Sequence, residues 1–261
     1  VAVAGTCLAL APARPVPLTT LAVVHALVAV ALRRAAREMN PGPRGAGHLL
    51  LPYGLWFASW IVLGRVFVLA GRSPHDGPIA AWDLALFGGP WHVRLGEVLS
   101  AGVFTEAMQF FYVSYYGIVV GPPLFLALRG RRAAIPRYTL HLMATYLACF
   151  LVYLVYPVVG PRALAEAAAA GPDTTGTGLA GFAAALRHLG DSQGTAFPSS
   201  HCAAALTAAL AAGTHAPAWA RVGLIAWALL IAVATVHTGN HYLLDSLAGI
   251  LLALALRRVV R

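Results

Sequence analysis

The stretch His237-Thr-Gly-Asn-His241-Tyr-Leu-Leu-Asp245-Ser-Leu-Ala-Gly249 gathers polar and ionisable side chains between two long apolar runs. His241 and Asp245 are four residues apart, so on a helix they would share one face. A carboxylate in that position can accept a hydrogen bond from one imidazole nitrogen, which leaves the other nitrogen as a nucleophile or a base. The stretch therefore predicts a reactive histidine at the start of an apolar helix.

The composition predicts that this helix and its neighbours lie in a bilayer. Hydrophobic residues make up 59% of the 261 residues, charged residues only 10%, and the mean hydropathy is +0.74. A soluble domain carries about 25% charged residues. The net charge of +9 does not indicate nucleic-acid binding, because the basic residues stand in short clusters between apolar runs. The three cysteines, Cys7, Cys149 and Cys202, lack metal-ligand or disulfide spacing.

Seven apolar segments predict an all-α fold, a polytopic membrane bundle of six to seven helices that forms a single domain over residues 1–261. The segments are 17–32, 49–70, 107–128, 138–159, 199–213, 218–236 and 241–256. The six-helix variant omits the first of them. The fifth is short, roughly 22 Å as a helix, so its first residues are expected below the membrane surface. The catalytic core is expected at about 138–256.

The placement of arginines sets the expected orientation, because cytoplasmic loops are enriched in basic residues. Most arginines fall on one side of the predicted bundle, at positions 33, 34, 37, 44, 129, 131, 132, 137, 221, 257, 258 and 261. This side is assigned as cytoplasmic. The loops 71–106 and 163–197 are then extracytoplasmic. The aromatics of 71–106 indicate an interfacial or reentrant helix, or a simple aromatic belt. The second loop is expected to hold a short helix near 179–189 or to act as a mobile lid.

Two further features are expected at the extracytoplasmic face beside His241. Pro198-Ser199-Ser200-His201 has the pattern of a helix N-terminus, where serine is a good cap and free N–H groups favour an anion. Arg162 ends the run Tyr153-Leu-Val-Tyr-Pro157-Val-Val-Gly-Pro161-Arg162. Alone it would be expected to snorkel, but beside two histidines its guanidinium geometry suits phosphate oxygens.

The ordered set Pro-Arg162, Pro-Ser-Ser-His201 and His241-x3-Asp245 resembles the three motifs of the type-2 phosphatidic acid phosphatase superfamily, which contains membrane lipid phosphatases and phosphotransferases. The resemblance covers about residues 153–249. Within the superfamily the chain is most similar to the inositol phosphorylceramide synthases and their bacterial relatives. The features shared with that branch are Tyr-x3-Pro-x3-Pro-Arg162, Phe-Pro-Ser-x-His201, Thr-Gly-Asn-His241-Tyr and, more weakly, Asp83-x3-Phe87-Gly88.

The chain departs from the phosphatase branch at three positions. Val155 stands where that branch has a lysine, Ala234-Thr235 where it has Ser-Arg, and Ser200 where it has glycine. The loss of two cations favours the synthase-like branch. His237 is a candidate substitute for one of them, or else a residue that simply ends a helix.

The resemblance implies a double displacement that uses no metal and no other cofactor. His241 would attack phosphorus to form a phosphohistidine, with Asp245 as its orienting partner and His201 as general acid and base. The substrate-binding residues would be Arg162, Ser199, Ser200 and His237. The partners would be membrane lipids, a phospholipid donor and a lipid alcohol acceptor such as ceramide or diacylglycerol. The expected location is a bacterial cytoplasmic membrane, with the active site facing outward and no nucleic-acid partner.

Three alternatives remain open at this point. A simple lipid phosphate or polyprenyl diphosphate phosphatase would use the same residues, with water as acceptor. A membrane transporter would carry intramembrane polar residues, for which the candidates are Arg65, Glu106, Gln109 and His141, yet the chain has no inverted repeat. Vanadate-dependent haloperoxidases share the superfamily's anion site but are soluble, so the apolar composition argues against them.

Overall fold

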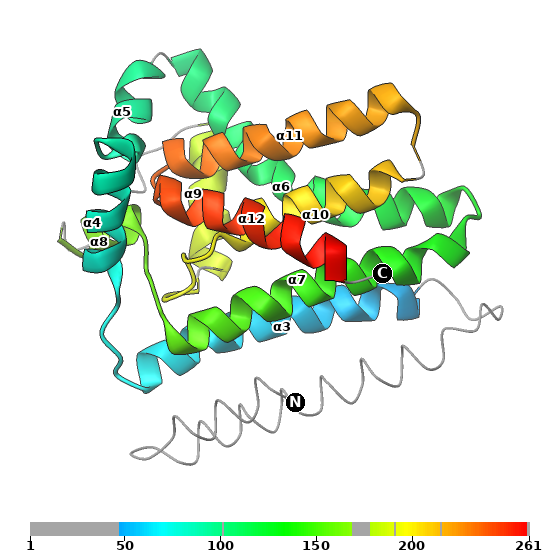
Figure 1. Cartoon of the computed structure of the whole chain (residues 1–261), viewed down its shortest axis with the longest axis horizontal. Helices are drawn as coiled ribbons and strands as arrows, with labels where there is room; N and C mark the ends of the chain where they lie inside the picture. Colours follow the sequence, from blue (N-terminus) through cyan, green and yellow to red (C-terminus); the bar gives the residue numbers. More distant parts are fainter. Residues whose placement is uncertain (1–46, 101, 169–177, 191, 215, 260–261) are drawn as a thin grey trace.

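The computed structural model describes residues 47–100, 102–168, 178–190, 192–214 and 216–259, which form a bundle of helices (Figure 1). In chain order the elements are α3 (Gly47–Leu69), α4 (Asp76–Phe87), α5 (Trp91–Val98), α6 (Gly102–Leu128), the 3-10 helix η1 (Arg132–Ala134), α7 (Ile135–Val155), α8 (Pro161–Ala168), α9 (Gly178–Gly190), α10 (Ser200–Gly213), α11 (Ala218–His237) and α12 (Leu243–Val259). The all-α prediction is confirmed. The first predicted segment, 17–32, lies outside the described residues.

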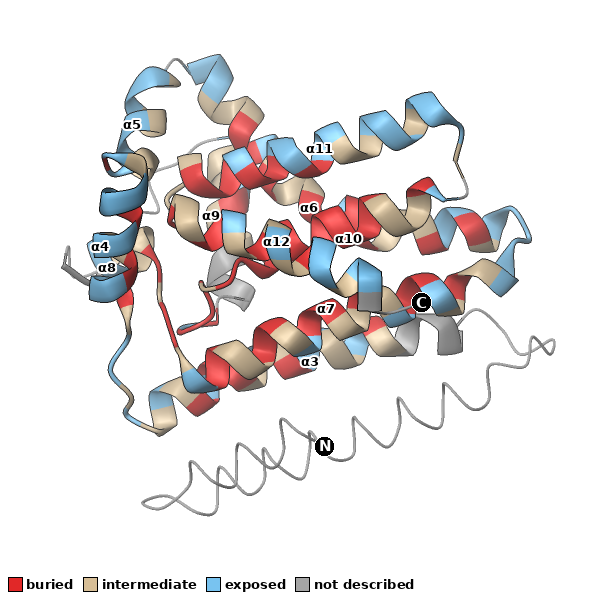
Figure 2. Ribbon diagram, in the orientation of Figure 1, coloured by how far each residue is buried: buried red, intermediate tan, exposed pale blue. Residues whose placement is uncertain are grey.

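Within the described residues, four helical stretches are long and apolar enough to cross a membrane. They are α3 from Pro52, α6, η1 with α7, and α11. α10 is apolar but has 14 residues, about 21 Å of helix, as the short fifth segment predicted. α11 carries exposed large apolar side chains such as Trp219 and Val222. Figure 2 shows much of this helix as exposed. The chain is therefore an integral membrane protein, while the number of crossings stays a prediction.

α10 is the central helix of the bundle, in contact with α6, α7, α11 and α12. Its buried positions are largely alanines, at 203, 204, 205, 208 and 209. Small side chains let helices approach closely, and close packing drives helix association where lipid removes the hydrophobic advantage. α12 comes so near that a Cβ added at Gly249 would lie 2.3 Å from the carbonyl oxygen of Ser199. Figure 2 shows α10 as mostly buried among its neighbours.

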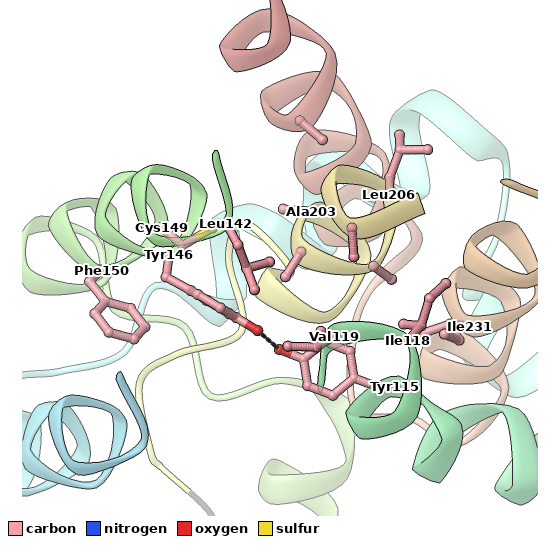
Figure 3. Packing of buried hydrophobic residues seen from close by; sticks show 14 of the residues in the cluster. Tyr115, Ile118, Val119, Leu142, Tyr146, Cys149, Phe150, Ala203, Leu206 and Ile231 are labelled. Carbon is pink, nitrogen blue, oxygen red and sulfur yellow. Dashed lines mark hydrogen bonds between the residues drawn. The ribbon is translucent and has the colours of Figure 1, made fainter. Parts of the chain in front are cut away.

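Tyrosine hydroxyls inside the bundle are paired. The hydroxyls of Tyr115 on α6 and Tyr146 on α7 lie 2.5 Å apart (Figure 3). Tyr138, at the start of α7, donates to the carbonyl oxygen of Val119 at 2.7 Å. Buried polar groups must be hydrogen-bonded to avoid a desolvation cost. These bonds therefore fix α6 against α7 on the side of the bundle that meets α10.

α7 ends four residues earlier than predicted, at Val155 instead of 159. Pro157 explains the early end, because the residue before a proline is driven out of helical geometry. Tyr156 has φ −134° and ψ 71°. Val158 then forms a parallel bridge with Thr195 and accepts the N–H of Ala196 at 2.7 Å. The connection that leads to Arg162 is thus held beside the connection that leads to His201.

The two long loops contain helices. The loop 71–106 holds α4 and α5, and α4 buries Asp76, Ile79 and Asp83 while it exposes Trp82 and Leu84. The short helix predicted near 179–189 is confirmed as α9, and α8 precedes it. Figure 1 places α4 and α8 together at the end of the bundle where α10 begins and α11 ends.

Candidate active site

His241 lies in the turn between α11 and α12, two residues before α12 begins at Leu243. The prediction that His241 and Asp245 share a helix face is therefore wrong. The cause is a local cap, because Asp245 Oδ2 accepts the N–H of Tyr242 at 2.9 Å and so starts the helix after His241. The same Oδ2 still lies 3.6 Å from His241 Nδ1. Both side chains are buried, with exposed fractions of 4% and 0% for the two residues.

Ser199 caps α10 as the sequence predicted. Its Oγ accepts the N–H of Cys202 at 3.3 Å. Its own N–H donates to the carbonyl oxygen of Asp245 at 2.9 Å, which joins the start of α10 to the first turn of α12. Tyr153 of α7 holds the same turn, since its hydroxyl accepts the N–H of Ser200 at 3.2 Å. The N-terminus of α10 is thus fixed from two sides.

His201 is the second residue of α10 and faces His241. The centroids of the two imidazole rings are 5.8 Å apart. Two tyrosines of α6 pack on the His201 ring, Tyr112 stacked at 5.3 Å and Tyr115 tilted at 4.3 Å between centroids. Its buried Nδ1 has no hydrogen-bond partner among the described residues. The aromatic contacts fix the plane of the ring without using its nitrogens, which suits a group that must exchange a proton.

Arg162, the second residue of α8, is brought to the histidines by the turn that precedes α12. Its N–H donates to the carbonyl oxygen of Gly239 at 2.8 Å, and its guanidinium donates to Asn240 Oδ1. Gly160, with φ +90°, permits this approach, because a Cβ there would lie 2.5 Å from the carbonyl oxygen of Asn240. The turn that ends in His241 therefore orients the arginine as well.

One cavity of about 180 Å³ joins these side chains. The polar residues that line it are Arg162, Glu166, Ser192, Thr195, Ser200, His201, Asn240 and His241. Six aromatic residues of α3 and α6 also line it: Trp56, Phe57, Trp60, Tyr112, Tyr115 and Tyr116. The cavity thus combines a cationic and imidazole end with an apolar side.

Three predicted site residues lie outside the cavity lining, and one of them, Asp245, stands behind His241. Ser199 is fully buried and its side chain serves the α10 cap. His237, in the last turn of α11, places Nε2 3.4 Å from the carbonyl oxygen of Leu99. It lies at the junction with the connection between α5 and α6. His237 is therefore not placed to contact a substrate in this cavity.

Two carboxylates of α4, which the sequence did not identify as site residues, hold the site together. Asp76 accepts the N–H groups of Val159 at 2.9 Å and of Gly160 at 2.8 Å, just before Arg162. Asp83 accepts the N–H of Leu244 at 2.7 Å, in the first turn of α12. The sequence signal available for them was the seven-residue spacing of Asp76 and Asp83, because residues seven apart on a helix share a face. Without the fold, nothing in the sequence indicated what that face would contact.

Burial raises the pKa of Asp83 above its ordinary value of 3.8, although the N–H of Leu244 and nearby His92 lower it in part. Burial lowers the pKa of His92, and the charge of Asp83 opposes that shift. A raised folded-state pKa means that the carboxyl contributes most stability below its unfolded pKa, and this contribution is lost as the pH rises through the folded value.

Asp83→Asn removes the ionisation but keeps an oxygen that accepts the N–H of Leu244. We expect the melting temperature of Asp83→Asn, relative to the unmodified protein, to increase as the pH rises from below 3.8 through the folded pKa. Asp83→Ala, which loses the cap, should be less stable than Asp83→Asn by about 1 kcal/mol at every pH. Thermal unfolding in detergent across pH measures both. If the difference in melting temperature between Asp83→Asn and the unmodified protein did not change with pH, the raised pKa of Asp83 would be contradicted.

Comparison with known proteins gives the family. The family model described as the PAP2 superfamily, the superfamily of the type-2 phosphatidic acid phosphatases, matches residues 78–258. A PA-phosphatase related-family protein of Dictyostelium discoideum is 32% identical over 111 residues, which are 41% of this chain and 20% of that relative's length. No solved structure matches the chain significantly. Because the family match takes in well over half of the sequence, the chain belongs to the PAP2 superfamily.

Proposed function

We propose that the chain is a membrane lipid phosphotransferase that cleaves a phosphoester through a phosphohistidine and passes the phospho group to a lipid alcohol. One observation carries the proposal: His201, His241 and Arg162 line a single cavity, and a buried carboxylate stands behind His241. These are the groups that an in-line displacement at phosphorus requires, namely a nucleophile, a proton donor and a cation for the oxygens.

In the first half-reaction His241 attacks phosphorus. Asp245 Oδ2 lies near Nδ1, which leaves Nε2 as the attacking nitrogen and places a negative charge beside the imidazolium that forms. The bond between phosphorus and the leaving oxygen breaks, and His201 gives that oxygen a proton. The products are a phosphohistidine at His241 and a free lipid alcohol.

In the second half-reaction His201 removes a proton from the acceptor hydroxyl. The acceptor oxygen attacks phosphorus, the bond from phosphorus to Nε2 breaks, and His241 returns to its starting form. The reaction needs no redox partner and, in this proposal, no metal ion. Arg162 and Ser200 at the N-terminus of α10 hold the non-bridging oxygens. Ser199 supports that N-terminus through its cap, and we leave His237 out of the site.

The surroundings of the site favour a lipid alcohol over water as acceptor. Val155 and Thr235 stand at the positions of the two cations of the phosphatase branch, and neither carries a charge. Val155 is 60% exposed, and the hydroxyl of the fully buried Thr235 lies 3.2 Å from that of Ser246. The aromatic wall of α3 and α6 gives the cavity an apolar side where a lipid alcohol would be stabilised by burial. We place this end of the bundle on the extracytoplasmic side, because the described arginine clusters lie at the other end.

The transporter alternative gains no support from the described residues. Glu106 accepts the N–H of Leu179 at 3.0 Å and so holds the first turn of α9. His141 lies near the opposite end of the bundle from the catalytic cavity. Neither of these two candidates lines the cavity between the two catalytic histidines.

Turnover by the purified protein in detergent tests the proposal. Phosphatidate, polyprenyl diphosphate and phosphatidylinositol are each offered with and without ceramide or diacylglycerol, in the presence of EDTA. We expect transfer of the phospho group, detected as the phosphorylated acceptor, only when a lipid alcohol is present. Release of free phosphate without an acceptor would show a phosphatase instead. Activity lost in EDTA and restored by a divalent cation would contradict the metal-independent route.

A further inference from the structure

A second cavity lies at the other end of the helices that carry the candidate active site. It has a volume of about 360 Å³ and is formed by α7, α10 and α12. These three helices pack against one another (Figure 1). His201 and Thr214 mark opposite ends of α10, roughly 20 Å apart along its axis. The two cavities are therefore separate sites, and of these three helices α10 lines both.

Two arginines from different helices line the second cavity. Arg137 stands in the first turn of α7 and Arg257 in the last turn of α12. Over the part of the chain that the structure describes, no carboxylate lines this cavity or forms an ion pair with either arginine. Two positive charges thus converge on one hollow without a neutralising side chain from the described residues. Such basic pockets between membrane helices suit anionic head groups.

The remaining polar groups of the cavity are already bonded within the bundle. The hydroxyls of Thr145 on α7 and Thr207 on α10 lie 3.0 Å apart, and Thr145 also donates to the carbonyl oxygen of His141 at 2.9 Å. His141 Nδ1 lies 2.8 Å from the carbonyl oxygen of Arg137. These bonds shape the inner wall, so the two guanidinium groups are the donors left for a ligand.

The other walls are apolar. Leu210 of α10 and Leu256 of α12 line the cavity beside the arginines. Guanidinium groups bind phosphate oxygens in a two-pronged geometry, and an adjacent apolar wall accommodates hydrocarbon. The combination of two unneutralised arginines with leucines matches the junction between the head group and the chains of an anionic phospholipid.

We propose that this second cavity binds a phosphate-bearing anion between Arg137 and Arg257, either the head group of an anionic phospholipid from the adjoining leaflet or free phosphate. The site is independent of the chemistry at His241. Bound there, the anion would link α7 to α12 at the end of the bundle opposite the catalytic cavity.

Two double variants of the protein test the site. Arg137→Gln with Arg257→Gln removes the two arginines that line the cavity. Arg129→Gln with Arg258→Gln removes two exposed arginines from the same end, at positions that do not line it. Both variants keep the catalytic cavity, so phosphate binding there is common to both. Native mass spectrometry in detergent counts retained phosphatidylglycerol against phosphatidylcholine, and thermal unfolding with inorganic phosphate tests the free anion.

We expect the Arg137/Arg257 variant to bind phosphatidylglycerol at least about tenfold more weakly, and the Arg129/Arg258 variant to change by roughly twofold or less. If the Arg137/Arg257 variant loses phosphatidylglycerol binding but is still stabilised by inorganic phosphate, the ligand is a lipid head group. If it loses both, free phosphate is sufficient for binding at this site. If the Arg137/Arg257 variant does not fold, the single variants Arg137→Gln and Arg257→Gln are compared instead with Arg129→Gln and Arg258→Gln. The proposal is overturned if the two double variants bind phosphatidylglycerol equally well. It is also overturned if the unmodified protein does not retain phosphatidylglycerol in preference to phosphatidylcholine.

Discussion

Replacing His241 by alanine is expected to abolish turnover while the chain still folds. The imidazole supplies the nucleophile, so its loss removes the covalent route and should lower kcat by about 10⁴-fold or more. Folding should survive because the α12 cap is formed by Asp245 and the N–H of Tyr242, neither of which involves the His241 side chain. Initial rates and thermal unfolding of the same detergent preparation measure the two effects separately.

His237 provides the matched control for this experiment. It is a histidine four residues earlier, at the end of α11, but it faces the carbonyl oxygen of Leu99 outside the cavity lining. His237→Ala should therefore keep kcat within a fewfold of the unmodified enzyme. His201→Ala should lie between the two, with a loss of roughly 10²–10⁴-fold for the missing general acid and base. Normal activity in His241→Ala, or equal losses at His237 and His241, would overturn the nucleophile assignment.

Local sequence signals predicted the parts of the structure that depend on neighbours in the chain. The cap at Ser199 and the helix near 179–189 follow from residue type and periodicity, and both are confirmed. The apolar runs predicted six of the described helices for the same reason, because a bilayer requires length and low charge. The early end of α7 was also visible in principle, since Pro157 disfavours helix at the preceding residue.

Contacts between distant segments could not be predicted. The carboxylate of Asp76 meets backbone N–H groups more than 80 residues away, and N–H groups carry no sequence signature. His237 was predicted as a candidate substitute for a missing cation or as a residue that ends a helix, and it lies outside the cavity lining. In the structure α11 ends with this side chain turned towards the carbonyl oxygen of Leu99. The positions of the helices decide which of two nearby histidines reaches the cavity.

Asp76→Ala is expected to cause a large loss of activity, although Asp76 does not line the cavity. One buried carboxylate, 4% exposed, accepts the N–H groups of Val159 and Gly160, and the hydroxyl of Tyr242 lies 3.4 Å from its Oδ1. It therefore ties the segment before Arg162 to the residue after His241. Misplacement of catalytic groups by about 1 Å costs about 10²-fold. We expect kcat to fall by that order, with a smaller change in KM.

The conservative variant separates positioning from simple destabilisation. Alanine leaves two buried N–H groups without an acceptor, which costs about 1–3 kcal/mol each in stability. Asp76→Asn restores one acceptor but turns an amide N–H₂ towards the second donor, so its activity should fall between those of the unmodified enzyme and Asp76→Ala. Glu97→Ala, at an exposed acid of α5, is the control and should retain full activity. Rates are measured well below each melting temperature and expressed per folded molecule. If Asp76→Ala then showed an unchanged kcat, α4 would be a structural support alone, because a carboxylate that positions Arg162 and His241 cannot be removed without moving them.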